Sequence, residues 1–299
     1  MSDFTRVARR IDHVVSAAPH TVLGTMRRAD HRRSQLARMH TSLRSAVAEQ
    51  PTPGLLVFVA ADGLGQVGRL WLKATDEVRG GVIGRHDMVD LQLAFHDELS
   101  LRQALFVVRL HEARVRFSVV DLDTPNGLIA ADERPAHLLE GQAPLSFRTG
   151  PFSLFCVPTG PGAVLPDDLE RAWDCFDAHA AVRPDSWVRR LWPPSRRRPS
   201  GMLSVSTPGA FTHYALDMEA LERGVLVGRA PRCGVQLAHD HGVSRVHAVL
   251  LSVDGVPHVI DAGSTNGLWL LGEEVRCQPL RDQDCLSLGN SSFTWSAAQ

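Results

Sequence analysis

The sequence predicts a mainly β fold made of two similar halves, and two observations indicate it. Short runs rich in Val, Leu and Ile alternate with turns rich in Gly, Asn, Asp and Ser, which is typical of consecutive β-strands. Several of these runs and turns recur in the same order in both halves of the chain, as an internal repeat would. With 299 residues, of which 44% are hydrophobic and 22% charged, the chain has the length and composition of about two soluble globular domains.

The pattern of strands and turns is clearest in the second half of the chain. Apolar runs at 225–227, 246–253 and 258–260 predict three strands. Polar turns separate them, and the Asn-Gly pair at 266–267 is a strong signal for a tight turn. The three turns read Gly228-Arg229, Ser244-Arg245-Val246-His247 and Ser264-Thr265-Asn266-Gly267.

If these turns meet at one end of the fold, they bring together hydrogen-bond donors and no carboxylate. The donors are the side chains of Arg229, Ser244, Arg245, Thr265 and Asn266. Charge-assisted hydrogen bonds from guanidinium groups to phosphate are strong, so this set suits a doubly charged phosphate ester. The set holds no evident pair of base and nucleophile, which predicts binding without catalysis. Each residue alone would be an ordinary surface, turn or core residue, and only their order carries the prediction.

The order Gly-Arg, then Ser-x-x-His, then a Thr-Asn-Gly turn resembles the forkhead-associated (FHA) domain over about residues 201–299. The resemblance implies a β-sandwich that binds phosphothreonine in a partner protein. It implies that the phosphopeptide contacts are Arg229, Ser244, Thr265 and Asn266, with Arg245 as a further phosphate contact. It also implies that the loops of the site are supported by His247, Gly228 and Gly267. One departure is Gln283-Asp284, where the family usually has Gly-Asp.

The first half, over residues 51–158, repeats several of these features. The run Gly81-Val82-Ile83-Gly84-Arg85 matches Val225-Leu226-Val227-Gly228-Arg229, and Ser100 follows Gly84 by 16 positions, as Ser244 follows Gly228. We therefore expect strands at 55–59, 70–73, 145–147 and 152–157, and a second FHA-like sandwich.

The site of this first copy is degenerate. Arg85, Ser100 and Asn126 remain, but Leu101 and Gln103 stand where the second copy has Arg245 and His247. Thr124-Pro125 replaces Ser264-Thr265, and proline has no backbone N–H to donate. With fewer donors and without the bracing histidine, the first copy is predicted to be a weak or non-binding scaffold module.

Residues 1–50 are predicted to be helical, with one stretch at 3–18 and a second that ends before Pro51. The second stretch carries an apolar stripe of Leu36, Met39, Leu43 and Val47. We expect this stripe to pack on the next domain and the arginines of the other face to be solvated: Arg27, Arg28, Arg32, Arg33, Arg38 and Arg44. Binding to nucleic acid or to an anionic membrane is the alternative, but no aromatic residue for base stacking accompanies these arginines.

Residues 159–200 are predicted to hold one helix and a linker rich in Pro and Arg. Leu169, Trp173, Phe176 and Ala180 lie on one helical face, and Asp167 and Asp168 suit the start of a helix. From residue 182 onward, the prolines and arginines indicate a semi-rigid linker.

The five cysteines are widely spaced and odd in number, which argues against a disulfide framework or a zinc site. We expect reduced thiols, no metal and no cofactor. No apolar run approaches the roughly 18 residues that span a bilayer, and the N-terminus lacks the apolar core of a signal peptide. A cytoplasmic protein without a membrane partner is therefore expected.

Three functions fit these features to different degrees. The first, which the resemblance favours, is a non-enzymatic adaptor in Ser/Thr kinase signalling, whose partner is a phosphothreonine-containing protein, either the kinase or its substrate. The second is a phosphate-independent scaffold built on the two sandwiches. The third is an enzyme that uses His239-Asp240-His241 as a metal or base cluster, although three adjacent side chains in a loop cannot all point one way.

Overall fold

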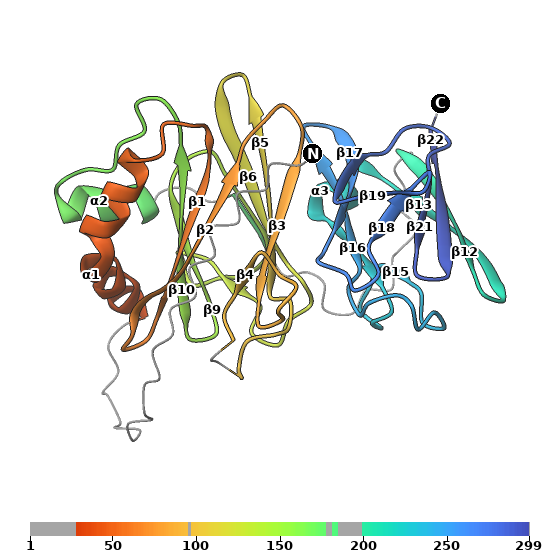
Figure 1. Cartoon of the computed structure of the whole chain (residues 1–299), viewed down its shortest axis with the longest axis horizontal. Helices are drawn as coiled ribbons and strands as arrows, with labels where there is room; N and C mark the ends of the chain where they lie inside the picture. The colour runs from red at the N-terminus through yellow and green to blue at the C-terminus, as the bar shows by residue number, and fades with distance from the viewer. Residues whose placement is uncertain (1–27, 95–96, 178–180, 185–198, 299) are drawn as a thin grey trace.

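The structure is a computed structural model that describes residues 28–94, 97–177, 181–184 and 199–298. It is mainly β, as predicted, and consists of two β-sandwiches side by side, with two helices on the far side of the first (Figure 1). The predicted helical stretch at 3–18 lies outside the described residues. All five cysteines are free, as expected.

The first sandwich is one sheet folded on itself, in the order β2-β1-β10-β9-β7-β8-β6-β5-β3-β4. Strands β1 and β10 lie opposite β5 and β6, and apolar side chains such as Val57, Phe106 and Phe147 fill the space between them. The predicted opening and closing strands are present. The strands are β1 (Gly54–Ala61), β2 (Gly65–Lys73), β3 (Arg79–Gly84), β4 (Leu91–Gln92), β5 (Ala104–His111), β6 (Arg114–Asp121), β7 (Leu128–Ile129), β8 (Pro135–Gly141), β9 (Leu145–Thr149) and β10 (Phe152–Thr159).

The second sandwich has two sheets, in the orders β13-β12-β22-β21-β18-β19 and β15-β14-β16-β17-β20. Leu203, Leu250 and Trp295 are among the buried side chains between them. The strands are β12 (Gly201–Thr207), β13 (Ala210–Leu216), β14 (Val225–Gly228), β15 (Val235–Gln236), β16 (Ala248–Val253), β17 (Val256–Asp261), β18 (Leu268–Leu270), β19 (Glu273–Val275), β20 (Cys277–Pro279), β21 (Cys285–Leu288) and β22 (Ser291–Ala297).

The two sandwiches have the same strand order. Strands β2-β1-β10-β9-β7 of the first correspond to β13-β12-β22-β21-β18 of the second, and β6-β5-β3-β4 correspond to β17-β16-β14-β15. The single strand β8 takes the place of the two short strands β19 and β20, between which Arg276 lies. The repeat in the sequence therefore coincides with a repeat in topology.

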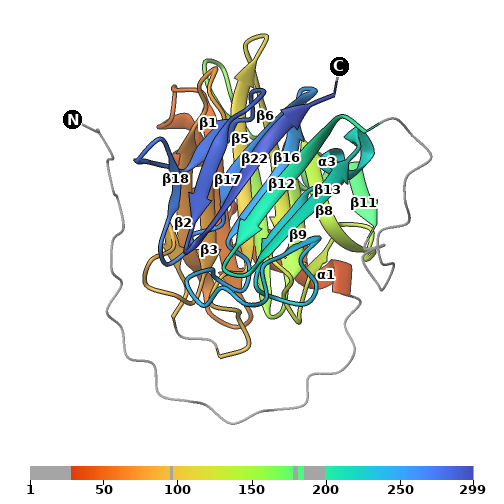
Figure 2. The same cartoon turned by 90° about the vertical axis from the view of Figure 1, so that its right-hand side faces the viewer.

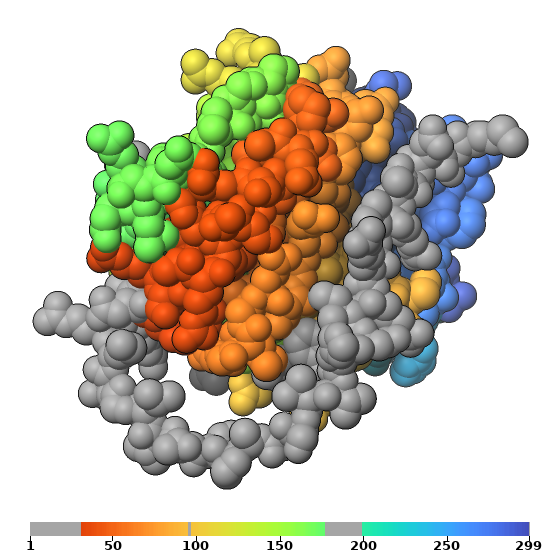
Figure 3. Space-filling model, turned by 60° about the vertical axis from the view of Figure 1, so that its left-hand side comes forward, coloured from red at the N-terminus to blue at the C-terminus, as the bar shows by residue number. Residues whose placement is uncertain are grey.

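Helix α1 (Arg28–Ala48) packs on the first sandwich through its predicted apolar stripe. Leu36 and Leu43 are fully buried and share a cluster with Phe58 and Phe155 of strands β1 and β10. Helix α2 (Leu169–Asp177) adds Phe176 to the same cluster. Figure 3 shows α1 in red-orange beside the green segment that contains α2.

One arginine of α1 corrects the expectation of a solvated basic face. Arg32 is fully buried, and its Nη2 atom donates to the Ala131 carbonyl oxygen at 2.5 Å and to Glu133 at 3.3 Å. Its guanidinium carbon also lies 6.0 Å from the ring centre of Trp173. Because these groups compensate the charge, Arg32 fixes the helix on the sandwich. Of the other arginines, Arg33 and Arg44 form ion pairs with Glu170 and Asp167.

The predicted linker contains a short strand. Residues of β11 (Ala181–Pro184) pair with β8 of the first sandwich, so this part of 159–200 belongs to the sheet. The remaining Pro- and Arg-rich part, residues 185–198, lies outside the described residues. In the described ranges, all helices lack either the length or the apolar character that crossing a membrane requires.

The two sandwiches share a buried apolar interface made of corresponding strands. Val82, Leu105 and Val120 of β3, β5 and β6 belong to one cluster with Leu226 and Val249 of β14 and β16 and with Ile260 of β17. Counted from the Gly-Arg pair, Val82 corresponds to Leu226 and Leu105 to Val249. The same face of each sandwich is therefore covered by the other, and strands β12 and β22 lie on the side away from the first sandwich (Figure 2).

Candidate anion-binding site

The three polar turns of the second sandwich meet at one end of its inner sheet. Strand β16 lies between β14 and β17 and runs antiparallel to both. The end of β14, the start of β16 and the end of β17 therefore lie at the same edge. Arg229 follows β14, Ser244 precedes β16, and the turn at 262–267 follows β17.

Hydrogen bonds connect the predicted site residues in these turns. The Arg229 amide donates to the Ser244 carbonyl oxygen at 3.0 Å, and the Thr265 amide donates to the Ser244 hydroxyl at 3.1 Å. The hydroxyl oxygens of Ser244 and Thr265 are 3.5 Å apart. Asn266 donates from Nδ2 to the carbonyl oxygen of Gly242 at 2.8 Å. The structure thus brings Arg229, Ser244, Thr265 and Asn266 together.

The two arginines of this edge have no carboxylate partner among the residues that the structure describes. Arg229 Nε donates to the carbonyl oxygen of Val243 at 3.3 Å, which orients its guanidinium, and Arg245 is exposed. Neither has an ion-pair partner among the described residues. The edge therefore presents two cations beside exposed hydroxyl and amide groups.

Glycine is required at position 228, where two of the turns come into contact. A Cβ atom at Gly228 would lie 2.3 Å from the Arg245 carbonyl oxygen, far inside van der Waals contact. That same carbonyl oxygen accepts the Ala230 amide at 2.9 Å. The close approach places Arg229 directly against the Ser244 turn.

His247 joins the Ser244 turn to the turn that ends in Gly267. Its Nδ1 atom accepts the Ser244 amide at 3.1 Å, and Nε2 donates to the Gly267 carbonyl oxygen at 2.9 Å, so the ring is neutral with its proton on Nε2. The side chain is fully buried. Burial lowers the pKa of His247 below its ordinary value, against the opposing effects of the Gly267 hydrogen bond and the charge of Asp261.

Two carboxylates also shape this edge: Asp261, which sequence reasoning did not assign, and Asp240, which it named only as part of a possible metal or base cluster. Asp261 accepts the amides of Gly263 and Ser264 at 3.0 and 3.2 Å, which closes the third turn. The five-residue spacing from this aspartate to Asn266, which both halves share, was the signal that could have indicated its role.

Asp240 is the second carboxylate, and it is 1% exposed. It accepts the Gly242 amide at 2.9 Å, two nitrogens of Asn290 at 2.8 and 3.0 Å, and the Ser291 hydroxyl at 2.6 Å. Burial alone would raise the pKa of Asp240, but these hydrogen bonds outweigh it, and the pKa is lowered. His239 and His241 are exposed, so the three residues do not converge on a common point. Within the described ranges, no group of three or more His, Cys, Asp or Glu residues could hold a metal.

The first sandwich repeats the frame of this edge with nearly the same geometry. The Arg85 amide donates to the Ser100 carbonyl oxygen at 3.0 Å, and Arg85 Nε donates to the Leu99 carbonyl oxygen at 3.3 Å. Asn126 Nδ2 donates to the carbonyl oxygen of Glu98 at 2.6 Å. Arg85, Ser100 and Asn126 therefore lie together as their counterparts do.

The expected loss of loop bracing in the first sandwich is wrong. Gln103 accepts the Ser100 amide through Oε1 at 3.1 Å, and its Nε2 donates to the hydroxyls of Thr124 and Thr149 at 2.6 and 2.7 Å. Thr149 in turn donates to the Gly127 carbonyl oxygen at 2.7 Å. Glutamine thus connects the same two turns that His247 connects in the second sandwich.

The first sandwich lacks two of the exposed donors of the second, the Thr265 hydroxyl and the Arg245 guanidinium. Pro125 stands in place of Thr265, and Leu101, in place of Arg245, is 51% exposed. The remaining cation, Arg85, lies 3.5 Å from a carboxylate oxygen of Asp97. This edge is less cationic than that of the second sandwich.

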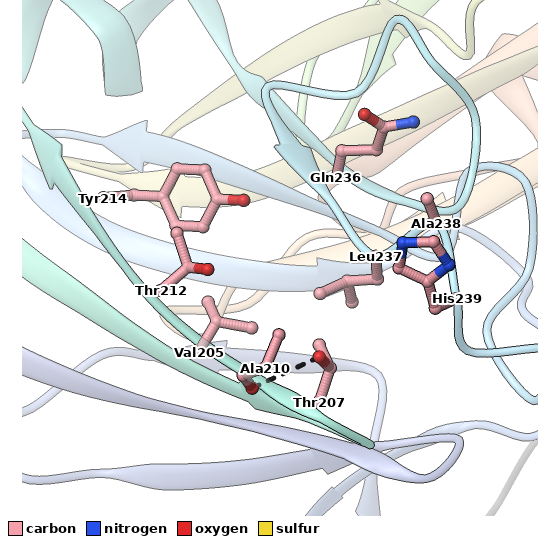
Figure 4. Close-up of a pocket in the computed structure, with 9 residues that line it drawn as sticks. All are labelled: Val205, Thr207, Ala210, Thr212, Tyr214, Gln236, Leu237, Ala238 and His239. Carbon is pink, nitrogen blue, oxygen red and sulfur yellow. Dashed lines mark hydrogen bonds between the residues drawn. The ribbon is translucent and has the colours of Figure 1, made fainter.

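A separate hollow of about 210 Å³ lies between strand β13 and the segment around β15 (Figure 4). Tyr214, Gln236 and His239 are among its lining side chains, and none of the five predicted site residues lines it. It borders the loop at 238–243 that leads to Ser244. The hollow is therefore a neighbour of the donor set and not a part of it.

Solved FHA domains are similar to about a third of the chain. One is the FHA-1 domain of Rv1747 from Mycobacterium tuberculosis, with 30% identity over 33% of this chain and 99% of that one, at a TM-score of 0.27. Another is the FHA domain of CT664 from Chlamydia trachomatis, with 23% identity over 33% and 98%, at a TM-score of 0.30. No curated protein matches the chain. The family model of the FHA domain matches residues 225–289, which contain all three polar turns of the second sandwich.

Proposed function

We propose that the protein binds a phosphothreonine-containing segment of a partner protein through the second sandwich. The observation that carries the proposal is the convergence of Arg229, Ser244, Thr265 and Asn266 at one edge, within the segment that matches the FHA domain. A phosphothreonine carries a charge of about −1.5 to −2 near neutral pH. The partner would therefore gain affinity only after its threonine is phosphorylated.

Each residue has a distinct task in this proposal. Arg229 and Arg245 supply the positive charge, and the fork of a guanidinium can bind two phosphate oxygens at once. Ser244 and Thr265 supply hydroxyl donors beside it. The Nδ2 group of Asn266 donates to the Gly242 carbonyl oxygen. The side-chain oxygen of Asn266 is therefore left to accept a backbone N–H of the bound peptide.

We extend this proposal to the domains of the whole chain. Residues 201–299 form the FHA domain, residues 51–158 a degenerate FHA-like domain that binds phosphopeptides weakly or not at all, and residues 1–50 and 159–200 the helical segment and the connection. In the cell, such a protein would act as a cytoplasmic adaptor in Ser/Thr kinase signalling. Its partner would be a phosphorylated kinase or a phosphorylated substrate of one.

Calorimetric titration of the full chain with a peptide library tests the proposal. The library contains each sequence with phosphothreonine, phosphoserine and unmodified threonine. We expect binding only of phosphorylated peptides, and a loss of at least about tenfold in Arg229→Ala, because a hydrogen bond to a charged group contributes roughly 1.5–3 kcal/mol.

Arg223→Ala is the matched control, since Arg223 lies on helix α3 (Met218–Arg223) and pairs with Glu219. Equal affinity of wild type and Arg229→Ala would refute the proposal. Co-purification of a partner that survives phosphatase treatment would instead favour a phosphate-independent scaffold.

A further inference from the structure

Among the described residues, four arginines form ion pairs across the interface between the two sandwiches. Their pairs are Arg109 and Arg116 with Asp254 at 3.1 and 2.6 Å, Arg232 with Asp123 at 3.1 Å, and Arg276 with Asp90 at 3.0 Å. Arg102 also reaches across this interface, but it forms no ion pair within the described part of the chain. A half-buried cation without a carboxylate partner is compensated only by solvent and nearby dipoles, so a bound anion would stabilise it further.

Arg102 belongs to the first sandwich but reaches the anion-binding edge of the second. Its Nη2 atom donates to the hydroxyl oxygen of Thr265 at 3.3 Å, and Thr265 is exposed. A Cβ atom at Gly263, in the same turn, would lie 3.6 Å from Arg102 Nε. The guanidinium therefore touches the third turn of the site from the side of the neighbouring sandwich.

The local charges leave Arg102 undercompensated. Its Nε atom is buried and has no hydrogen-bond acceptor among the described residues. Asp261 is the nearby carboxylate, but its oxygens accept the amides of Gly263 and Ser264. Burial lowers the pKa of Arg102, and the charge of Asp261 only partly opposes this. An anion beside Thr265 would supply the missing negative charge.

We propose that Arg102 is a phosphate contact of the second sandwich, supplied by the first. This inference rests on the proposed function and extends it, because it makes the first sandwich a part of the binding site. A phosphate that accepts the Thr265 hydroxyl lies next to the Nη atoms of Arg102, so the site holds three cations: Arg102, Arg229 and Arg245.

The repeat explains how Arg102 came to lie there. Counted from Ser100 and Ser244, Arg102 corresponds to Val246, which is buried in the apolar interface cluster. Val246 thus faces the interface from the second sandwich. At the corresponding position of the first sandwich, the longer side chain of Arg102 crosses the interface. The first sandwich has lost rim donors of its own site but supplies one to its neighbour.

The test uses the full chain and three variants. Arg102→Gln removes the charge, Arg102→Lys keeps it without the fork, and Arg116→Gln is the matched control. Arg116 also crosses the interface, but its partner Asp254 lies in the β16–β17 turn at the opposite end of these strands. Each protein is titrated with a phosphothreonine peptide and, separately, heated in the presence and absence of inorganic phosphate.

We expect Arg102→Gln to weaken peptide binding about tenfold, Arg102→Lys to restore part of it, and Arg116→Gln to bind as wild type does. The rise in melting temperature caused by phosphate should shrink in Arg102→Gln alone. If phosphate raises the melting temperature of the wild type but no phosphopeptide binds, the proposed function is refuted. The melting temperature of Arg102→Gln in phosphate then still decides whether Arg102 contacts phosphate. An unchanged response in Arg102→Gln, or no response in the wild type, would overturn it.

Discussion

At the scale of single residues, the two sandwiches join their polar turns with different side chains. His247 and Gln103 occupy corresponding positions, and each accepts the amide of the serine three residues earlier. Each also reaches the turn that ends in Gly267 or Gly127. His247 donates to Gly267, and Gln103 donates to Thr124 and, through Thr149, is connected to Gly127. The function of this position is to join the turns, and an acceptor and a donor on one side chain are sufficient for it.

This equivalence predicts the outcome of substitution at His247. His247→Gln should retain phosphopeptide binding and most of the stability, whereas His247→Ala should cost about 2–3 kcal/mol of unfolding free energy, because it leaves the Ser244 amide unsatisfied. Denaturant unfolding and peptide titration measure both effects. If glutamine is as damaging as alanine, the bracing explanation is wrong.

The lowered pKa of His247 predicts a loss of stability in acid. The folded state holds the ring neutral, while the unfolded chain protonates it near the ordinary value of about 6.5. The unfolded state therefore binds more protons, and stability falls as pH drops below about 6.5, by at most ~1.4 kcal/mol per pH unit for this group. The pKa of His258, lowered mainly by burial, acts in the same direction.

Denaturation midpoints at pH 7.5 and 5.5 measure this loss of stability in acid. His247→Gln is the comparison, because this variant should lose the part of the pH dependence that belongs to His247. An identical slope in the two proteins would contradict the assignment.

Asp240 offers a third prediction at this scale. In Asp240→Asn one acceptor oxygen would have to serve four donors, and the new NH2 group would face some of them, so we expect a cost of about 2–4 kcal/mol. Glu273→Gln, at an exposed position on β19, is the control for removal of a carboxylate. The unfolding free energy of Asp240→Asn should lie about 2–4 kcal/mol below that of Glu273→Gln, and similar values in the two variants would contradict this role.

At the scale of elements, the strands around the site were predictable and several others were not. Strands β14, β16 and β17 consist of β-branched runs bounded by strong turn signals. In strand β13 only Tyr214 is half-buried and only Leu216 is buried, so it lacks the alternation that predicts a half-buried strand. Helix α3 has six residues, and its start depends on Asp217, which accepts the Ala220 amide at 2.8 Å.

Strand β11 shows a different reason for failure. Its sequence, AVRP, contains a proline and precedes a Pro- and Arg-rich stretch, so local pattern indicates a linker. Its partner, β8, lies about 40 residues earlier in the chain. Buried Arg32 was missed for a similar reason, because the carbonyl oxygen that compensates it comes from Ala131. Local sequence does not reveal partners of this kind.

Helix α1 carries a prediction of its own. Leu43 is fully buried against the first sandwich, and Leu43→Ala should reduce the unfolding free energy by about 2–5 kcal/mol through lost contacts and a cavity. Arg38→Ala, at an exposed position of the same helix, should change it by less than about 0.5 kcal/mol. Denaturant unfolding of both variants measures the difference, and equal stabilities would mean that the helix is not part of the folded unit.

At the scale of the whole molecule, the first sandwich contacts the turn that holds Thr265, and sequence reasoning did not address how the two sandwiches meet. The interface strands are buried on both faces; in β5, for example, residues 104–108 are all buried. Such continuous apolar runs predict that something covers the second face but do not identify what does. That Arg102 reaches Thr265 follows only from the three-dimensional arrangement.

Because the apolar cluster is continuous across both sandwiches, they should unfold together. We expect one calorimetric transition whose calorimetric and van't Hoff enthalpies agree. Leu105→Asp, which would place an unpaired charge in this interface, should separate the transition into two. Two transitions in the wild type would show that the sandwiches are thermodynamically independent.

The meeting of corresponding faces has a consequence for the history of the chain. A single ancestral sandwich with this apolar face would have covered it by pairing with a second copy of itself. Fusion of two such genes would preserve the pairing while leaving the polar turns of each copy to diverge, as Pro125 and Thr265 have at corresponding positions.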